Sequence, residues 1–190
     1  MHFTDKFFNL INGMANKYDI LDKIMIFSSK TIPYVLMAIV VLVYFYGVIK
    51  KNKDIRLSSV NTVIKCAIGM IISQVIGGFF YFPRPFVNND VNLLYEHSLS
   101  ASFPSDHSLG SMSIALGLNV GIGVLSKINM FLAVFVGFTR VYVGHHYPLD
   151  VIGGFILAYI ICVVYNKYLY KFVSDIYMKV ESVMPILKRL

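Results

Sequence analysis

Four segments of the chain carry residues whose types and spacing suit the chemistry of phosphate groups. Arg84 lies between two prolines, and Arg140 lies near the end of an apolar run. A guanidinium group presents a planar fork of N–H donors that matches phosphate oxygens, whereas lysine offers only a point charge. The third segment, residues 104–107, reads Pro-Ser-Asp-His, and the fourth, residues 145–150, holds two histidines and an aspartate. We therefore interpret these segments as parts of one anion site.

The fourth segment predicts a histidine nucleophile. His146 precedes Asp150 by four residues, and Pro148 suits the first turn of a following helix. Four residues make about one helical turn, so we expect the Asp150 carboxylate to accept the imidazole N–H and fix its tautomer. The other imidazole nitrogen is then free to attack, and His107 is available to protonate a leaving oxygen. His145 competes as nucleophile, but it lies five residues from Asp150.

The third segment predicts an anion cradle. It leads directly into a long apolar run, so its backbone N–H groups are expected at a helix N-terminus, where an anion is favoured. Ser105 adds a hydroxyl donor, and Asp106 stands beside it. The simpler interpretation is that Ser105 and Asp106 only cap a helix, and that an isolated arginine reaches for lipid headgroups. The convergence of the segments favours phosphate binding, and we assign it to four residues: Arg84, Ser105, Asp106 and Arg140.

A metal site is the alternative interpretation of these side chains. His107, His145, His146 and Asp150 together have the donor types that a transition metal takes. The two arginines argue against it, because they would repel a divalent ion and already supply positive charge. We therefore expect no metal and no cofactor. Glu96 and His97 lie in the same outer loop and could touch a lipid head group, but we interpret them as ordinary loop residues.

The composition places these residues in a membrane. Of 190 residues, 57% are hydrophobic and only 14% are charged. Soluble domains average about 45–50% apolar and about 25% charged residues, so a soluble domain is excluded, and disorder more firmly still. The net charge of +7 is interpreted in terms of membrane orientation, with no nucleic-acid partner expected. Cys66 and Cys162 lie in apolar runs and are interpreted as buried hydrophobic residues.

The predicted fold is all-α, a polytopic membrane helix bundle forming a single domain over residues 1–190. A membrane-spanning helix needs about 20 mostly apolar residues. Runs near that length predict five spans, at Thr31–Ile49, Leu57–Phe82, Ser108–Ser126, Ile128–Val143 and Leu149–Tyr168. Before Lys30, apolar residues recur at helical spacing between polar ones, which predicts an amphipathic helix lying in the membrane interface. They are Phe3, Phe7, Phe8, Ile11 and Met14. A sixth, shallow span is the alternative.

Basic residues predict which side of the membrane each end of the bundle faces. Residues 50–56 hold four Lys or Arg, Lys127 is a further one, and the tail from Lys167 holds five. Lys and Arg favour the cytoplasmic side. Residues 83–107 and the turn around His145 are then expected together at the extracytoplasmic face. Residues 1–30 show no clean signal-peptide pattern, so we expect the first span to be retained.

The motifs resemble those of the type 2 phosphatidic acid phosphatases, the PAP2 superfamily. The resemblance rests on Arg84-Pro85, on residues 104–107, and on Arg140, His146 and Asp150 at their observed spacing, with a motif core at residues 77–150. It implies metal-independent hydrolysis of a lipid phosphoester or phosphoanhydride through a phosphohistidine. On this interpretation His146 attacks phosphorus, Asp150 orients it, and His107 protonates the leaving group.

The chain also departs from the family pattern. The first motif commonly carries a lysine where this chain has Gly77, and Asp106 and Thr139 stand where many members have Gly and Ser. The sequence of residues 102–107 and the small size of the chain are most similar to the bacitracin-resistance branch of bacterial undecaprenyl-diphosphatases. That branch implies a polyprenyl diphosphate substrate, which is cleaved in the bilayer at the outer face. Cleavage would recycle the lipid carrier for peptidoglycan biosynthesis. The alternatives are a phosphatidylglycerophosphate or broad-specificity lipid phosphatase and, from another class, a transporter of anionic lipids.

Overall fold

The computed structural model describes residues 3–118 and 123–183, and this part of the chain consists of helices joined by turns and loops. The elements are α1 (Phe3–Asn12), α2 (Asp19–Ile49), α3 (Lys53–Phe79), α4 (Pro85–Asn88), α5 (Asp106–Gly117), α6 (Gly123–Tyr142), α7 (Pro148–Tyr168) and α8 (Tyr170–Val183). The all-α prediction is therefore confirmed.

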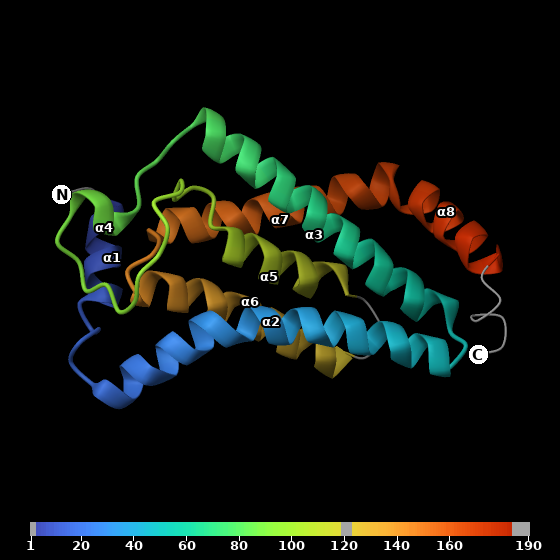
Figure 1. Ribbon diagram of the computed structural model, residues 1–190, viewed down its shortest axis with the longest axis horizontal. Coiled ribbons are helices and arrows are strands. Elements are labelled where there is room, and N and C mark those ends of the chain that lie inside the picture. The colour runs from blue at the N-terminus through green and yellow to red at the C-terminus, as the bar shows by residue number, and fades with distance from the viewer. Residues whose placement is uncertain (1–2, 119–122, 184–190) are drawn as a thin grey trace.

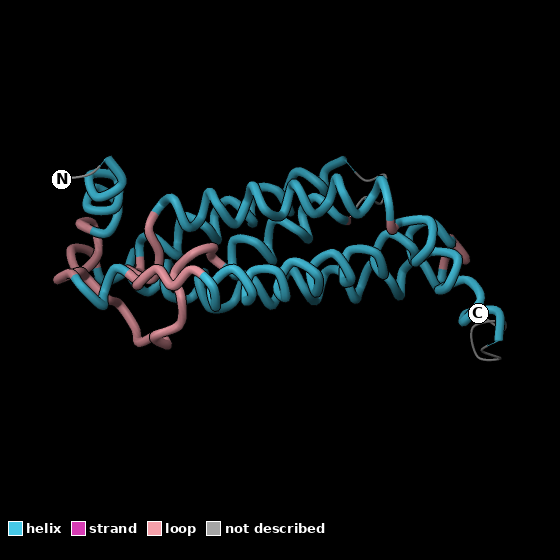
Figure 2. Tube along the Cα trace, turned by 90° about the horizontal axis from the view of Figure 1, so that it is seen from above, coloured by secondary structure: helices cyan, strands magenta, loops and turns pink. Residues whose placement is uncertain are grey.

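The bundle consists of helices that run side by side along the long axis of the molecule, with α5 lying among α2, α3, α6 and α7 (Figures 1 and 2). Helix α5 packs against α3, α6 and α7, and also touches α2. Its contact with α7 is very close at Gly154, where an added Cβ would lie 2.8 Å from the backbone oxygen of Ser105. Because small residues let helix backbones approach one another in lipid, this glycine brings the start of α5 onto the start of α7.

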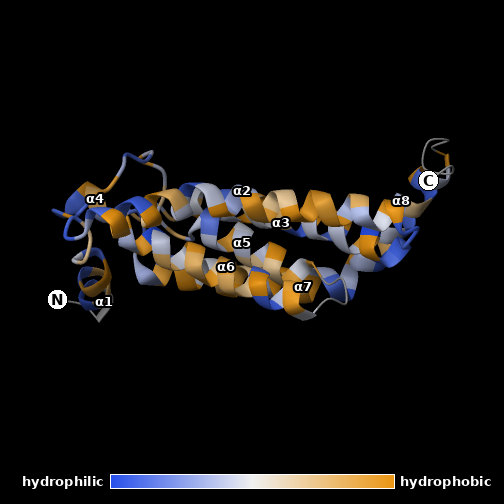
Figure 3. Ribbon diagram, turned by 90° about the horizontal axis from the view of Figure 1, so that it is seen from below, coloured by the Kyte–Doolittle hydropathy of each residue, from blue (hydrophilic) through white to orange (hydrophobic). Residues whose placement is uncertain are grey.

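Four helices, α2, α3, α6 and α7, are long and apolar enough to cross a membrane. Hydrophobic residues predominate in the middle of the bundle, and hydrophilic residues lie toward its ends (Figure 3). Large apolar side chains such as Tyr34, Phe131 and Ile156 are exposed on the outside. In a bilayer these side chains face lipid, so the chain is a multi-pass membrane protein.

The prediction of five long spans is wrong in its third member. Residues 108–126 do not form one helix, because α5 ends at Gly117 and α6 already begins at Gly123, not Ile128. The twelve residues of α5 rise only about 18 Å at about 1.5 Å per residue, against a hydrocarbon core of about 30 Å. Hydropathy did not separate the two helices because the residues between them are as apolar as the helices themselves. Residues 119–122 lie outside the described part.

The N-terminal region also differs from its prediction. Helix α1 covers only Phe3–Asn12, so Met14 lies beyond its end, and α2 begins at Asp19 rather than Thr31. Phe8 is buried against Val141 and Val151 of α6 and α7, while Phe7 is largely exposed. Helix α1 therefore packs one of its faces on the bundle, and its expected place in the membrane interface remains a prediction.

The two ends of the bundle differ in what they carry. The α2–α3 turn at Lys50–Asn52 and helix α8 lie at one end, and α1 and α4 lie at the other (Figure 1). Asn52 caps α3, because its side-chain oxygen accepts hydrogen bonds from the backbone N–H groups of Asp54 and Ile55 at 3.0 and 3.1 Å. The basic turn thus lies at the opposite end of the bundle from residues 83–107.

Candidate active site

Arg84 ties three segments of the site together. It has extended backbone, as a residue before proline prefers, and its side chain is buried. Nε donates to the carbonyl of Ser100 at 3.0 Å, and Nη2 donates to the hydroxyl of Ser100 at 3.1 Å and to the carbonyl of Ala101 at 3.2 Å. Nη1 donates to the carbonyl of His145 at 3.1 Å and to Nε2 of His146 at 2.9 Å. Burial, with Arg140 nearby, lowers the pKa of Arg84 to about 10.

The hydrogen bonds of His146 set its tautomer. Nδ1 donates to the carbonyl of Ser102 at 2.9 Å. A guanidinium group can only donate, so Nε2, which faces Arg84, carries the lone pair. Burial first, and then the charges of Arg84 and Arg140, lower the pKa of His146 well below its ordinary value. The ring is therefore neutral at neutral pH, with its unprotonated nitrogen toward Arg84.

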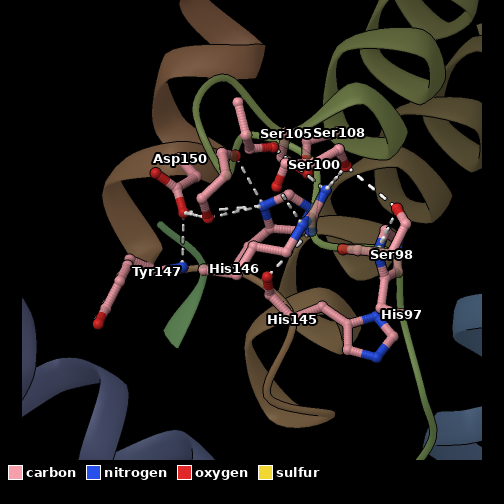
Figure 4. A network of polar contacts seen from close by, with 12 residues as sticks. His97, Ser98, Ser100, Ser105, Ser108, His145, His146, Tyr147 and Asp150 are labelled. Carbon is pink, nitrogen blue, oxygen red and sulfur yellow. Dashed lines mark hydrogen bonds and ion pairs between the residues drawn. The ribbon is translucent and has the colours of Figure 1, made fainter. Parts of the chain in front are cut away.

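Asp150 does not bind His146 directly, contrary to the sequence-based expectation. Its Oδ2 lies 3.7 Å from Nδ1 of His146, beyond hydrogen-bond distance. The carboxylate accepts the hydroxyl of Ser102 and the backbone N–H of Tyr147, the latter at 2.8 Å (Figure 4). The bond to Tyr147 belongs to the capping box that starts α7, so the local helix cap turns the carboxylate toward Ser102. Ser102 thus bridges the pair; the resemblance included this residue, within 102–107, but gave it no role.

His145 lies in a different environment from His146. It is fully buried, and its Nε2 donates to the carbonyl of Tyr95 at 2.8 Å. Its ring packs against the Tyr95 ring with centroids 4.3 Å apart. Within the described residues, no group of three His, Cys, Asp or Glu side chains is arranged to hold a metal ion.

The start of α5 contributes Ser105, Asp106 and His107. The backbone N–H of Ser105 donates to the carbonyl of Asp150 at 3.0 Å, and its hydroxyl accepts from Ser108 at 3.0 Å and keeps its own hydrogen to donate. The carboxylate of Asp106 accepts the hydroxyl of Ser73 on α3, so its observed partner is a neighbouring helix. Burial, followed by the charge of Arg140, lowers the pKa of His107 to about 3.

Arg140 is buried on α6 with part of its donor set in use. Nη1 donates to the hydroxyls of Ser29 at 2.9 Å and Tyr95 at 2.7 Å. Among the residues that the structure describes, Nε and Nη2 have no hydrogen-bond partner. Buried guanidinium donors are seldom left unpaired, so these two are suited to an anionic ligand. Sequence reasoning found Arg140 but missed Ser29 and Tyr95, which lie 111 and 45 residues away from it.

His97 joins the site from the loop between α4 and α5. Its ring centroid lies 4.6 Å from that of His145 and 6.4 Å from those of both His107 and His146. Glu96, its neighbour, is exposed. His97 is therefore a loop residue, as interpreted, but its side chain lies among the other three histidines.

Two features border this constellation. At Gly77 an added Cβ would lie 3.0 Å from Cβ of Ala101, so this position packs against the loop that binds Arg84. An open groove of about 590 Å³ lies beside Asp150, with Phe82, Phe103 and Leu149 among its walls. It offers a mostly apolar surface next to the polar residues.

Comparison with known proteins agrees with this geometry. Residues 58–174 match the PAP2 superfamily. The chain is 30% identical over 154 residues to the undecaprenyl-diphosphatase BcrC of Bacillus subtilis, covering 81% of this chain and 78% of that protein. It superposes on the crystal structure of LpxE from Aquifex aeolicus with a TM-score of 0.72 and 26% identity, over 88% and 97% of the two chains. A phosphatidylglycerolphosphate phosphatase of PAP2 type from Bacillus subtilis shares the fold, with a TM-score of 0.65 and 22% identity over 89% of each chain.

Proposed function

Because the chain belongs to the PAP2 superfamily of membrane phosphatases, we propose that it hydrolyses undecaprenyl diphosphate to undecaprenyl phosphate and phosphate. The observation that carries the proposal is the arrangement of His146, whose Nε2 lone pair lies 2.9 Å from Nη1 of Arg84. A second arginine with two unpaired donors completes an anion site beside this nucleophile. The particular lipid is supported by the name of the relative from Bacillus subtilis.

The first step transfers the terminal phosphoryl group to the enzyme. Nε2 of His146 forms a bond to phosphorus as the bond from phosphorus to the bridging oxygen breaks. Substrate binding breaks the hydrogen bond between Nη1 of Arg84 and Nε2 of His146, which frees the lone pair of Nε2 and one donor of Arg84. Arg84, Arg140 and the hydroxyl of Ser105 then hold the phosphoryl oxygens, where negative charge is concentrated. His107 donates a proton to the leaving oxygen. The pKa of His107 is low, and it rises when the anionic substrate offsets the charge of the arginines.

The second step releases phosphate with water. His107, now neutral, takes a proton from the water as its oxygen attacks phosphorus, and the bond from phosphorus to Nε2 of His146 breaks. The carboxylate of Asp150, 3.7 Å from Nδ1, stabilises the positive charge that the ring carries while it is phosphorylated. These residues supply the nucleophile, the acid and the anion clamp, so neither step requires a metal ion.

A lipid substrate suits the surroundings of the site. The apolar groove beside Asp150 lies at the end of the bundle, where a phosphate at the membrane surface and a tail in the bilayer can be bound together. A phosphatidylglycerophosphate or broad-specificity phosphatase is the alternative within the family. A transporter would place its binding residues near the bilayer midplane, whereas Arg84, Arg140 and Asp150 lie at the ends of helices.

Phosphate release from a lipid diphosphate in detergent, with EDTA present, tests the catalytic assignment. We expect the wild type to release phosphate and His146→Ala to lose activity. Equal rates for the two proteins would contradict the assignment of His146 as the nucleophile. Comparing undecaprenyl diphosphate, undecaprenyl phosphate and phosphatidylglycerophosphate then decides the substrate, because the proposal requires the first to be cleaved with the highest kcat/KM.

The proposal places the site at the extracytoplasmic face of the cell membrane, with the basic α2–α3 turn in the cytoplasm. Asn88, exposed at the end of α4, is a suitable position for a cysteine. We expect Asn88→Cys to react with an impermeant thiol reagent in intact cells, and Lys51→Cys, in the opposite turn, to react only after lysis. The reverse pattern would place the site in the cytoplasm.

A further inference from the structure

The loop that carries His97 is held firmly against the rest of the protein. The side chain of Asn12 pairs with the backbone of Asn92, accepting its N–H at 3.0 Å and donating to its carbonyl at 2.9 Å. Three residues further on, the hydroxyl of Tyr95 accepts from Arg140 at 2.7 Å. His97 follows two residues later, so its place is fixed by contacts to α1 and α6.

The His97 ring lies beside the path between nucleophile and acid. Its centroid is 6.4 Å from the ring of His146 and also 6.4 Å from the ring of His107. In an in-line transfer the phosphorus lies between these two histidines, about 3–3.5 Å from the attacking nitrogen. A residue equidistant from both rings therefore flanks the bond that breaks. The inner phosphate is attached to that bond on the His107 side of the phosphorus, and the His107 ring is 6.4 Å from that of His97.

A chain of hydrogen bonds connects His97 to the anion clamp. Nδ1 of His97 donates to the carbonyl of Ser98 at 3.2 Å. The hydroxyl of Ser98 lies 3.1 Å from that of Ser100, which accepts from Nη2 of Arg84 at 3.1 Å (Figure 4). Nδ1 is thus the orienting atom, and Nε2 is left as the atom that can meet a ligand.

We propose that His97 binds the inner, lipid-linked phosphate of a diphosphate substrate, while Arg84 and Arg140 hold the terminal phosphate that is transferred. This inference rests on the proposed function and adds a residue that selects diphosphates over monophosphates. Burial and the charge of Arg84 lower the pKa of His97 to about 4. The charge of a bound diphosphate opposes both effects, so the ring gains a proton and Nε2 becomes a charged donor.

The test compares substrates within each variant. We expect His97→Gln to lower kcat/KM for undecaprenyl diphosphate by about 10- to 100-fold, the scale of a hydrogen bond to a charged group. Activity on a lipid phosphate monoester should stay within about twofold, because that substrate lacks the inner phosphate. His97→Lys, which keeps a cation, should restore part of the preference. Leu99→Ala changes an exposed side chain of the same loop and should leave kcat/KM unchanged for both substrates.

Competitive inhibition gives a second measurement that needs no turnover of the monoester. His97→Gln should weaken inhibition by inorganic pyrophosphate by about tenfold and leave inhibition by orthophosphate unchanged, because only pyrophosphate has a second phosphate. Equal losses on both substrates and both inhibitors, or no loss on any, overturn the assignment of His97. A wild type that fails to cleave the diphosphate but cleaves a monoester instead overturns the proposed function itself.

Discussion

Asp150 and His146 are coupled through Ser102. The carboxylate lies 3.7 Å from Nδ1 of the imidazole, and the hydroxyl of Ser102 binds the carboxylate while its carbonyl binds the ring. One residue therefore positions both the proposed nucleophile and the acidic side chain beside it.

This arrangement predicts that the Ser102 hydroxyl matters for turnover. Ser102→Ala keeps the carbonyl that fixes the tautomer of His146 but removes the donor to Asp150. We expect kcat to fall about tenfold, since hydrogen bonds to charged groups contribute about 1.5–3 kcal/mol, with KM little changed. Steady-state kinetics on the lipid diphosphate measures this.

Two comparisons make the result specific to the bridge. Ser113→Ala removes a buried hydroxyl that has no hydrogen-bond partner in the described part of the chain, and it should leave kcat unchanged. In the double variant with Asp150→Ala, the loss from Ser102→Ala should be much smaller than in the wild type, because the two groups act together. Full additivity of the two losses would show that Ser102 and Asp150 act independently.

Tyr95 is predicted to position Arg140. Its hydroxyl accepts from Nη1 at 2.7 Å and lies 3.0 Å from the hydroxyl of Ser29, which directs the remaining donors of Arg140 away from these two groups. Tyr95→Phe keeps the ring against His145 but frees the guanidinium group. We expect kcat/KM to fall about tenfold. Tyr34→Phe alters a tyrosine that is 72% exposed on α2 and is the matched control; similar values for both variants would contradict the role of Tyr95.

The contrast between predicted and observed features has a physical basis. The spacing from His146 to Asp150 is local, and the short segment between them brings Nδ1 of His146 within 3.7 Å of the carboxylate, but His146 precedes the helix that starts at Pro148 and the expected direct hydrogen bond is not made. Ser102, Ser29 and Tyr95 were missed because their contacts join positions far apart in sequence, and a backbone carbonyl acceptor has no signature in residue type. Helix α5 was predicted too long because hydropathy does not report where an apolar stretch turns.

The buried histidines predict loss of stability in acid. Burial lowers the pKa of His145 to about 2, of His107 to about 3 and of His97 to about 4, from an ordinary value of 6.5. Below pH 6.5 these histidines therefore bind protons in the unfolded chain but stay neutral in the folded chain. Their contribution to the free energy of unfolding is complete above pH 6.5 and is lost as the pH falls. We expect the thermal midpoint in detergent to drop between about pH 7 and about pH 5.

His145→Asn tests this assignment, because asparagine can still donate to the carbonyl of Tyr95 but does not titrate. The groups that act on His145 are Arg140, His97 and His146, and all of them remain in the variant. Its midpoint should therefore fall less steeply with acid than that of the wild type. Identical slopes in the two proteins would mean that His145 does not contribute.

Gly154 is predicted to set the distance between α5 and α7 at the active site. A Cβ at this position would lie 2.8 Å from the carbonyl oxygen of Ser105 and 3.1 Å from the backbone nitrogen of Leu109. Both are backbone atoms, so Gly154→Ala must move the start of α5, which carries Ser105 and His107. Because a displacement of about 1 Å at a reacting group can lower the rate about 100-fold, we expect a large loss of kcat.

Gly110→Ala, where a Cβ meets nothing within 4 Å, should gain about 0.5–1 kcal/mol of helix stability and keep full activity. If Gly154→Ala retained activity while both variants were folded, the close contact of α7 with Ser105 would not be needed to place the phosphate-binding residues.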